Sequence, residues 1–107
     1  MNISPDTFPN TPDDWDIKTA ETIAKTDGIN MTDDHWELVR ALQEYYSKVE
    51  FVNLRQIKDA LDEKFHSRGG MKYLYQIIPG GPVAEGCRLA GLKAPAGAID
   101  KSFGSAA

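Results

Sequence analysis

The residue best suited to covalent chemistry is Cys87, the only cysteine among 107 residues. A thiol acts as a nucleophile in its thiolate form, which nearby positive charge stabilises. Arg88 and Lys93 lie close to Cys87 in sequence, and Pro82 can start a short helix just before it. These features favour a reactive thiol whose thiolate is assisted by Arg88 and Lys93. The alternative is a small, buried apolar side chain with no chemical role.

Metal and nucleotide sites find little support in the sequence. His35, His66 and Cys87 are far apart and form no CxxC, HxxxH or HExxH spacing. We therefore expect no metal centre, and surface or capping roles for the histidines. The stretches "GGMK" and "PGGPVAEG" match neither a P-loop nor a GxGxxG motif, so no cofactor is expected.

Charge is distributed unevenly along the chain. Residues 1–50 carry four Lys/Arg and eleven Asp/Glu, whereas residues 51–107 carry eight Lys/Arg and five Asp/Glu. The net charges of the two halves are therefore −7 and +3. From Lys64 to Lys93 five basic residues accompany one acid, Glu85. This excess either attracts phosphate or an acidic partner, or is ordinary solvated charge. Its candidate partner contacts are Arg68, Lys72, Tyr73 and Tyr75, and the two tyrosines could instead pack in a core.

Length and composition predict a single globular domain, residues 1–107, with 41% apolar and 26% charged residues. No apolar run approaches the roughly 20 residues that cross a bilayer, and the polar N-terminus does not resemble a signal peptide. One cysteine cannot form an internal disulfide. We therefore expect a cytoplasmic, monomeric protein that does not bind membranes and whose thiol stays reduced.

Hydrophobic spacing predicts four or five short helices. In "TPDDW", Thr11 can cap a first helix with Pro12 at its first position, and Gly28 can end it in a left-handed conformation. A second helix starts at Thr32 and runs through "MTDDHWELVRALQEYYSKV", in which apolar residues recur at helical spacing. Asn53 can cap a third helix.

The rest of the chain is less regular. "MKYLYQII" could be a buried strand or a short helix, because a short apolar run suits both. A helix from Pro82 to Ala90, stopped by Gly91, should follow. Residues 1–11 predict a loose N-terminal segment, and residues 92–107, rich in Lys, Ala, Pro, Gly and Ser, predict a mobile C-terminal arm.

The expected fold is mainly α, a small orthogonal helical bundle with a flexible C-terminal arm. The third helix, a glycine turn and "MKYLYQII" could form a helix-turn-helix-like unit. A DNA-reading unit presents polar side chains to the major groove, but this second helix is short and largely apolar. A packing unit without DNA contact is therefore favoured.

The chain resembles the DsrC/TusE family, small sulfur-relay proteins that include the gamma subunit of dissimilatory sulfite reductase. The resemblance covers about residues 14 to 98 and is most specific in "KYLYQIIPGGPVAEGCRLAGLKAPAGA". Its motifs are Lys-Tyr-Leu-Tyr, Pro-x-Gly-Pro, Cys-x-x-Ala-Gly-Leu and Pro-x-Gly. Here they are Lys72 to Tyr75, Pro79 to Pro82, Cys87 to Leu92, and Pro95 to Gly97.

The resemblance implies a helical bundle whose C-terminal arm ends in a cysteine that carries persulfide sulfur into a partner, a sulfite reductase or another relay protein. Some members have a second cysteine eleven residues earlier, and Cys87 matches that one. Ala98 stands at the carrier position, so it is either an engineered replacement or the residue of a divergent paralogue. The arm is extended by "IDKSFGSAA", and the short N-terminal segment puts the family's β-hairpin in question.

Three functions remain as hypotheses. The first is a sulfur-relay component with Cys87 as its persulfide carrier, since persulfide transfer is thiolate attack on sulfur. The second is a docking or regulatory partner of a sulfite reductase or sulfurtransferase that carries no sulfur. The third is a nucleic-acid-binding regulator that uses the helix-turn-helix-like unit. In the first two the protein is a co-substrate or effector rather than an enzyme with its own turnover.

Overall fold

The fold is built from α-helices and one 3-10 turn, seen in a computed structural model that describes residues 8–98. No strand occurs between residues 8 and 98, so the expected mainly α class is confirmed and that range contains no β-hairpin. None of the helices in that range is long and apolar enough to span a membrane. The elements are α1 (Ile17–Thr26), α2 (Asp33–Lys48), α3 (Leu54–Lys64), η2 (His66–Arg68), α4 (Gly70–Ile77) and α5 (Pro82–Ala90).

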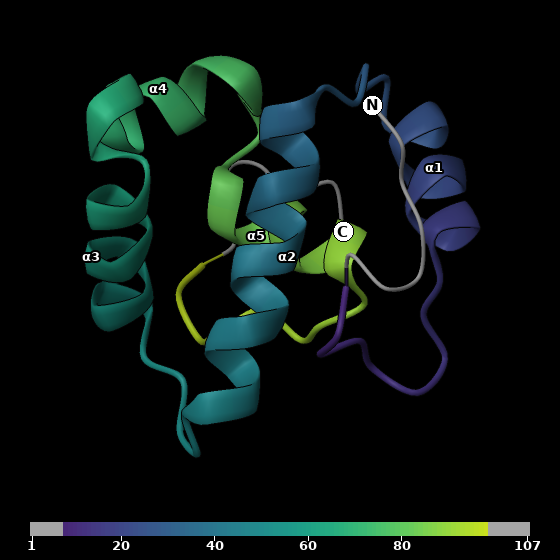
Figure 1. Cartoon of the computed structure of the whole chain (residues 1–107). Helices are drawn as coiled ribbons and strands as arrows, with labels where there is room; N and C mark the ends of the chain where they lie inside the picture. The colour runs from purple at the N-terminus through teal and green to yellow at the C-terminus, as the bar shows by residue number, and fades with distance from the viewer. Residues whose placement is uncertain (1–7, 99–107) are drawn as a thin grey trace.

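Helix α2 lies at the centre of the molecule and packs against α5, which crosses behind it (Figure 1). Helix α1 flanks them on one side, and α3 and α4 form the other side. The core lies where α2 and α5 meet. Leu38 and Leu42 of α2 and Cys87 and Leu89 of α5 are all fully enclosed there. Side chains buried to this extent each contribute roughly 1.5–3 kcal/mol of hydrophobic free energy.

The first helix begins later than the sequence predicts. Thr11 and Pro12 lie before a turn at Asp13 and Asp14, which the Trp15 amide closes by donating to the Pro12 carbonyl over 3.2 Å. Asp16 is the N-cap instead, because its carboxylate accepts the Thr19 amide at 2.7 Å. The predicted start at Thr11 is therefore wrong. The predicted end at Gly28 is confirmed, since its φ of +73° closes a left-handed helix terminus.

The other caps follow the sequence. The side chain of Asn53 accepts the Gln56 amide at 3.2 Å, and Thr32 caps α2. At Thr32 the cap is reciprocal, because Nδ1 of His35 accepts the Thr32 amide at 3.1 Å. Nε2 of the same ring lies 2.9 Å from the carbonyl oxygen of Ile77. His35 thus joins the start of α2 to the end of α4. Its contact with Thr32 is one of the capping roles expected for the histidines.

The ambiguous stretch "MKYLYQII" is helical. Gly70 begins α4 with a φ of +65°, and the next amide, that of Met71, donates to the Asp62 carboxylate at 2.8 Å. Leu74 and Ile78, one helical turn apart, are both buried. Pro82 starts α5 and Gly91, with a φ of +76°, ends it, as predicted.

Both ends of the described chain lie against the core. Phe8 is buried, with ring centroids 5.3 Å from Trp15 and 5.8 Å from Trp36. The predicted loose segment 1–11 therefore has an anchor at Phe8, while residues 1–7 lie outside the described residues. Of the predicted arm, residues 92–98 carry Leu92, Ala94 and Ala98, which pack on the core. Residues 99–107 lie outside the described range, and mobility of the arm stays a prediction.

Candidate functional site

Cys87 is fully buried on α5, beneath a tyrosine of α2. Its sulfur atom lies 3.5 Å from Oη of Tyr46 and has no exposed surface. Burial raises the pKa of the Cys87 thiol, and the hydrogen bond with Tyr46 acts more weakly in the opposite direction. In this arrangement the thiol is protonated at neutral pH and closed to a partner.

Tyr46 connects the thiol to the first residues of the C-terminal arm. Its hydroxyl donates to the backbone carbonyl of Lys93 over 2.6 Å while it touches the sulfur of Cys87. Burial, followed by the contact with Cys87, raises the pKa of Tyr46, so the phenol stays protonated. One hydroxyl group therefore joins α2, α5 and the arm. This role has no local sequence signal, because Tyr46 lies 41 residues from Cys87 and 47 from Lys93.

The two basic residues expected to assist the thiolate lie elsewhere. Nε of Arg88 is 2.9 Å from an Asp27 carboxylate oxygen and 3.8 Å from Glu85. Consecutive helical residues diverge by about 100° around the axis, which turns Arg88 away from its neighbour Cys87. Lys93 contributes its backbone carbonyl to Tyr46, and its side chain is exposed. No contact within residues 8–98 joins either cation to the sulfur, so the geometry of this structure does not support their predicted role.

Arg88 belongs to a charged cluster that joins α1 to α5. Burial, and then the neighbouring Asp27 carboxylate, raises the pKa of Glu85 to about 7. Hydrogen bonds from Glu85 and Arg88 lower the pKa of Asp27. The cluster borders a hollow of about 390 Å³ between the α1–α2 and α4–α5 loops. Asp27 has no spacing signal in the sequence, because it lies 61 residues from Arg88.

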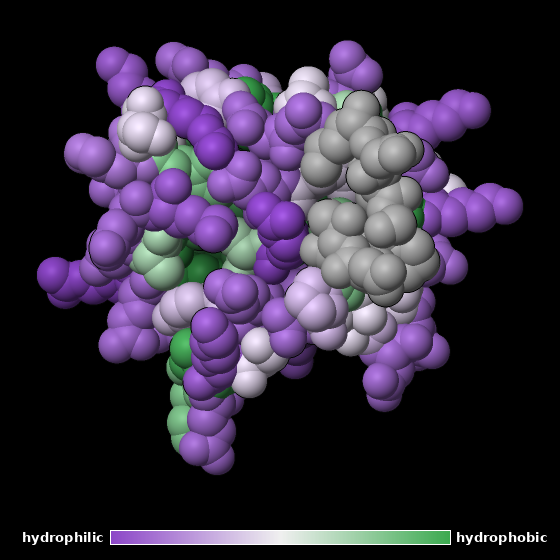
Figure 2. Space-filling view, viewed as in Figure 1, coloured by the Kyte–Doolittle hydropathy of each residue, from purple (hydrophilic) through white to green (hydrophobic). Residues whose placement is uncertain are grey.

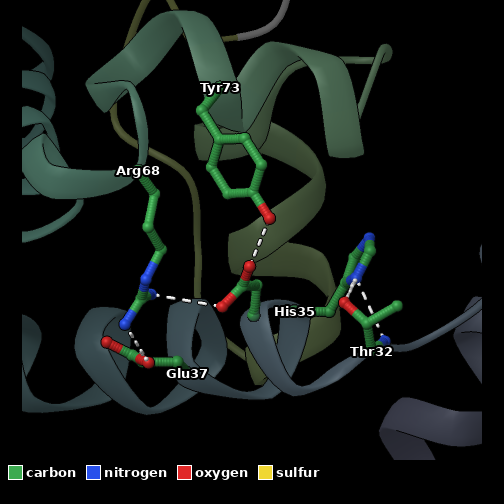
Figure 3. A network of polar contacts seen from close by, with 6 residues as sticks. Thr32, His35, Glu37, Arg68 and Tyr73 are labelled. Carbon is green, nitrogen blue, oxygen red and sulfur yellow. Dashed lines mark hydrogen bonds and ion pairs between the residues drawn. The ribbon is translucent and has the colours of Figure 1, made fainter.

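The candidate partner residues separate into two pairs. Arg68 and Tyr73 point toward α2 and close a polar network on its first turn (Figure 3). The Arg68 guanidinium lies 3.2 Å from Asp34 and 3.0 Å from Glu37, and the Tyr73 hydroxyl donates to Asp34. That hydrogen bond raises the pKa of Tyr73. The first pair therefore holds η2 and α4 onto α2.

Lys72 and Tyr75, the second pair, lie on the free side of α4. Both are exposed, and Tyr75 leaves 45% of its surface accessible. Helix α4 follows α3 and η2 and packs on α3, and the helix-turn-helix-like unit stays a prediction. Lys72 and Tyr75 are the predicted contacts that are free to meet a partner.

An apolar groove runs between α2 and α3, where hydrophobic atoms gather on the surface (Figure 2). It encloses about 280 Å³. The connection between the same two helices carries Phe51, which is 81% exposed. Neither feature is predictable from the sequence, because an exposed aromatic residue in a loop has no periodic signature. The groove is lined by Ala41, Glu44, Tyr45, Lys48, Val49, Ile57, Ala60, Leu61 and Lys64.

Ala98, at the position where the resemblance places a carrier cysteine, is half-buried against the core. Its amide donates to the Pro95 carbonyl over 3.1 Å, which closes a turn at the end of the described arm. A methyl side chain cannot hold sulfur. Across residues 8–98, no group of three or more His, Cys, Asp or Glu side chains is arranged to hold a metal ion.

Comparison with known proteins places these features in one family. The family model described as DsrC like protein matches residues 1–99. "Sulfurtransferase TusE" of Photorhabdus laumondii is 32% identical over 84 residues, which cover 77% of this chain and 76% of that protein. The Escherichia coli K12 protein of that name is 34% identical over 85 residues, covering 76% of each. The NMR structure of Allochromatium vinosum DsrC covers 91% of this chain and 88% of its own, with 31% identity and a TM-score of 0.67.

Proposed function

The chain belongs to the DsrC/TusE family, and from that premise we propose that it is a sulfur-relay protein in which Cys87 accepts sulfane sulfur once the C-terminal arm opens. The observation that carries the proposal is the position of the chain's only thiol. Cys87 lies in the family's C-terminal motif, at the root of the arm, and is joined to that arm through one tyrosine.

The proposed step is an exchange at sulfur. The Cys87 thiolate attacks the terminal sulfur of a donor persulfide, a new S–S bond forms at Cys87, and the donor leaves as its thiolate. The reverse reaction, with an acceptor thiolate attacking the terminal sulfur, passes the sulfur on. No net electron transfer occurs, so neither an oxidant nor a cofactor is needed. A single thiol suffices for both halves.

Burial makes the closed form unreactive, so transfer requires opening. The thiolate, not the thiol, is the nucleophile, and a raised thiol pKa keeps its population small. A partner that binds the open form shifts the equilibrium toward it in proportion to its preference for that form. The proposed partner is a sulfurtransferase or a sulfite reductase, and Lys72 and Tyr75 are the exposed residues proposed to meet it.

The experiment is the intact mass of the reduced, full-length protein after exposure to a small-molecule persulfide. A gain of one sulfur atom that is absent in Cys87→Ser supports the carrier function. Parallel treatment with iodoacetamide, before and after unfolding, measures access to the thiol. If the folded protein gains no sulfur from the small molecule or from a persulfide-loaded relay partner, while the unfolded protein is alkylated, the carrier function is wrong.

A second function, docking on a relay partner without carrying sulfur, is favoured by Ala98 together with the burial of Cys87. In that case Cys87→Ser should bind a TusE-type relay partner as tightly as the unaltered protein, and sulfur should not appear on the chain when a persulfide-loaded partner is added. Lys72→Glu, which reverses one exposed charge on α4, should weaken the same complex.

A further inference from the structure

The hydroxyl of Tyr46 has one proton and two neighbours that compete for it. It lies 2.6 Å from the carbonyl oxygen of Lys93 and 3.5 Å from the sulfur of Cys87. A carbonyl oxygen can only accept, so in the closed form the phenolic proton is directed at Lys93. The contact with Cys87 is then made by the thiol proton, which the sulfur donates to the phenolic oxygen.

We propose that Tyr46 is a positioning residue that couples ionisation of Cys87 to release of residues 92–98, the described part of the C-terminal arm. This inference rests on the proposed function of Cys87. When the thiol loses its proton to solvent hydroxide, the sulfur becomes a charged acceptor facing an oxygen that no longer receives a hydrogen bond. Hydrogen bonds to charged groups are roughly twice as strong as neutral ones. The Tyr46 proton therefore turns to the thiolate, and the Lys93 carbonyl loses its donor.

Within residues 8–98, this is the one side-chain hydrogen bond that holds the root of the arm. The Leu92 amide belongs to the turn that ends α5, because it donates to the Cys87 carbonyl at 2.8 Å. Lys93 is thus the first residue of the arm beyond the turn. Once the bond to Tyr46 is lost, residues 92–98 are held by the packing of Leu92, Ala94 and Ala98 alone, which makes their release easier. Formation of the nucleophile and loosening of the first residues of the arm become a single event.

Other charged groups near α5 are directed away from the sulfur. Glu85 and Arg88 of α5 face Asp27 at the end of α1, and the Lys93 ammonium is exposed. Tyr45 of α2, the neighbour of Tyr46, lines the groove toward α3. Among residues 8–98, Tyr46 is the residue in direct polar contact with the thiol, so a substitution there tests the coupling specifically. Tyr45→Phe removes a hydroxyl from the adjacent position and serves as the matched control.

The test follows carbon NMR signals of the isotope-labelled, full-length protein from neutral to alkaline pH. The Cβ signal of Cys87 reports ionisation of the thiol, and the carbonyl signal of Lys93 reports its hydrogen bond. In the unaltered protein and in Tyr45→Phe, both signals should move with the same midpoint. In Tyr46→Phe, Cys87 should still titrate while Lys93 stays constant. A Lys93 signal that ignores the Cys87 titration in the unaltered protein, or follows it in Tyr46→Phe, overturns the coupling.

A second measurement does not depend on reaching the alkaline midpoint. The hydrogen bond to Lys93 opposes opening, so its loss in Tyr46→Phe should speed alkylation of Cys87 by roughly three- to tenfold at constant pH. Tyr45→Phe should leave that rate unchanged, and equal rates in both variants overturn the inference. Co-titration without sulfur uptake would contradict the proposed function alone, whereas sulfur uptake without co-titration would contradict this inference alone.

Discussion

The indole nitrogen of Trp15 donates a hydrogen bond of 2.6 Å to the backbone carbonyl of Leu89, 74 residues away. Trp15 is itself buried and in edge-to-face contact with Phe8. The contact fixes the segment before α1 onto the last turn of α5, two residues from Cys87. The N-terminal segment is therefore part of the framework that holds the candidate site.

Replacing Trp15 by Phe should lower the free energy of unfolding by about 1–3 kcal/mol, because a buried carbonyl loses its donor. Urea denaturation followed by far-UV circular dichroism measures the change, and Trp36 remains as a fluorescent probe. An unaltered m-value would show that the denatured state is unaffected. A loss below about 0.5 kcal/mol would mean that the hydrogen bond contributes little.

Gly86 is required where α5 meets α2. A Cβ atom there would lie 2.7 Å from Cδ1 of Leu42 and 3.3 Å from Cδ2 of Leu38, both fully enclosed. Gly86→Ala should cost about 1–2 kcal/mol, since overpacking outweighs the better helix propensity of alanine. Combination with Leu42→Ala should reduce that cost, as a double-mutant cycle would show. Gly28→Ala, which strains a positive φ in open space, should cost about 1 kcal/mol, independently of Leu42.

Glu85 should make stability fall as the pH rises from about 4.5 to about 7, the pKa values of its carboxyl in the unfolded and folded chain. Across that window the folded state binds more protons than the unfolded state, so the slope is negative. After screening by Arg88 and solvent we expect about 1 kcal/mol. Glu85→Gln should flatten this part of the profile, whereas Glu44→Gln, at an exposed position, should not. Equal slopes in Glu85→Gln and the unaltered protein would contradict the assignment.

Asp34→Asn should loosen η2 and α4 from α2, because Asp34 accepts from both Arg68 and Tyr73. The expected loss of about 1 kcal/mol should shrink as salt is raised, since the ion pair is partly exposed. Asp33→Asn removes an exposed charge from the same first turn and controls for the helix dipole. Equal losses in the two variants, at any ionic strength, would show that the network adds nothing beyond the dipole.

Local chemistry made much of the fold predictable. The caps at Thr32 and Asn53 depend on hydrogen bonds within three residues, and the end of α5 depends on Gly91 alone. The start of α1 was mispredicted because Thr11 and Pro12 are a good local signal that a long-range contact overrides. Trp15, drawn to the end of α5, leaves the chain before it in a turn.

The candidate site was predictable as a set of residues but not as an arrangement. Cys87 was identified from its type and its motif, yet its burial depends on Tyr46, a residue of another helix. Arg88 was expected beside the thiol because it is adjacent in sequence, but helical rotation and the distant partner Asp27 turn it away. Contacts across 40 to 60 residues are set by how the helices pack, which no local pattern encodes.

The C-terminal arm begins at Gly91, a point that stays in place when the arm moves. A Cβ atom at Gly91 would lie 2.8 Å from Cδ1 of Trp15, so Trp15 packs tightly against the corner between α5 and the arm. Residues 92–98, fully extended, could sweep out to about 25 Å from that corner. Cys87 precedes Gly91 and stays behind in α5. The sulfur of Cys87 therefore does not move with the arm, and a partner must bring its own sulfur atom inward to reach it.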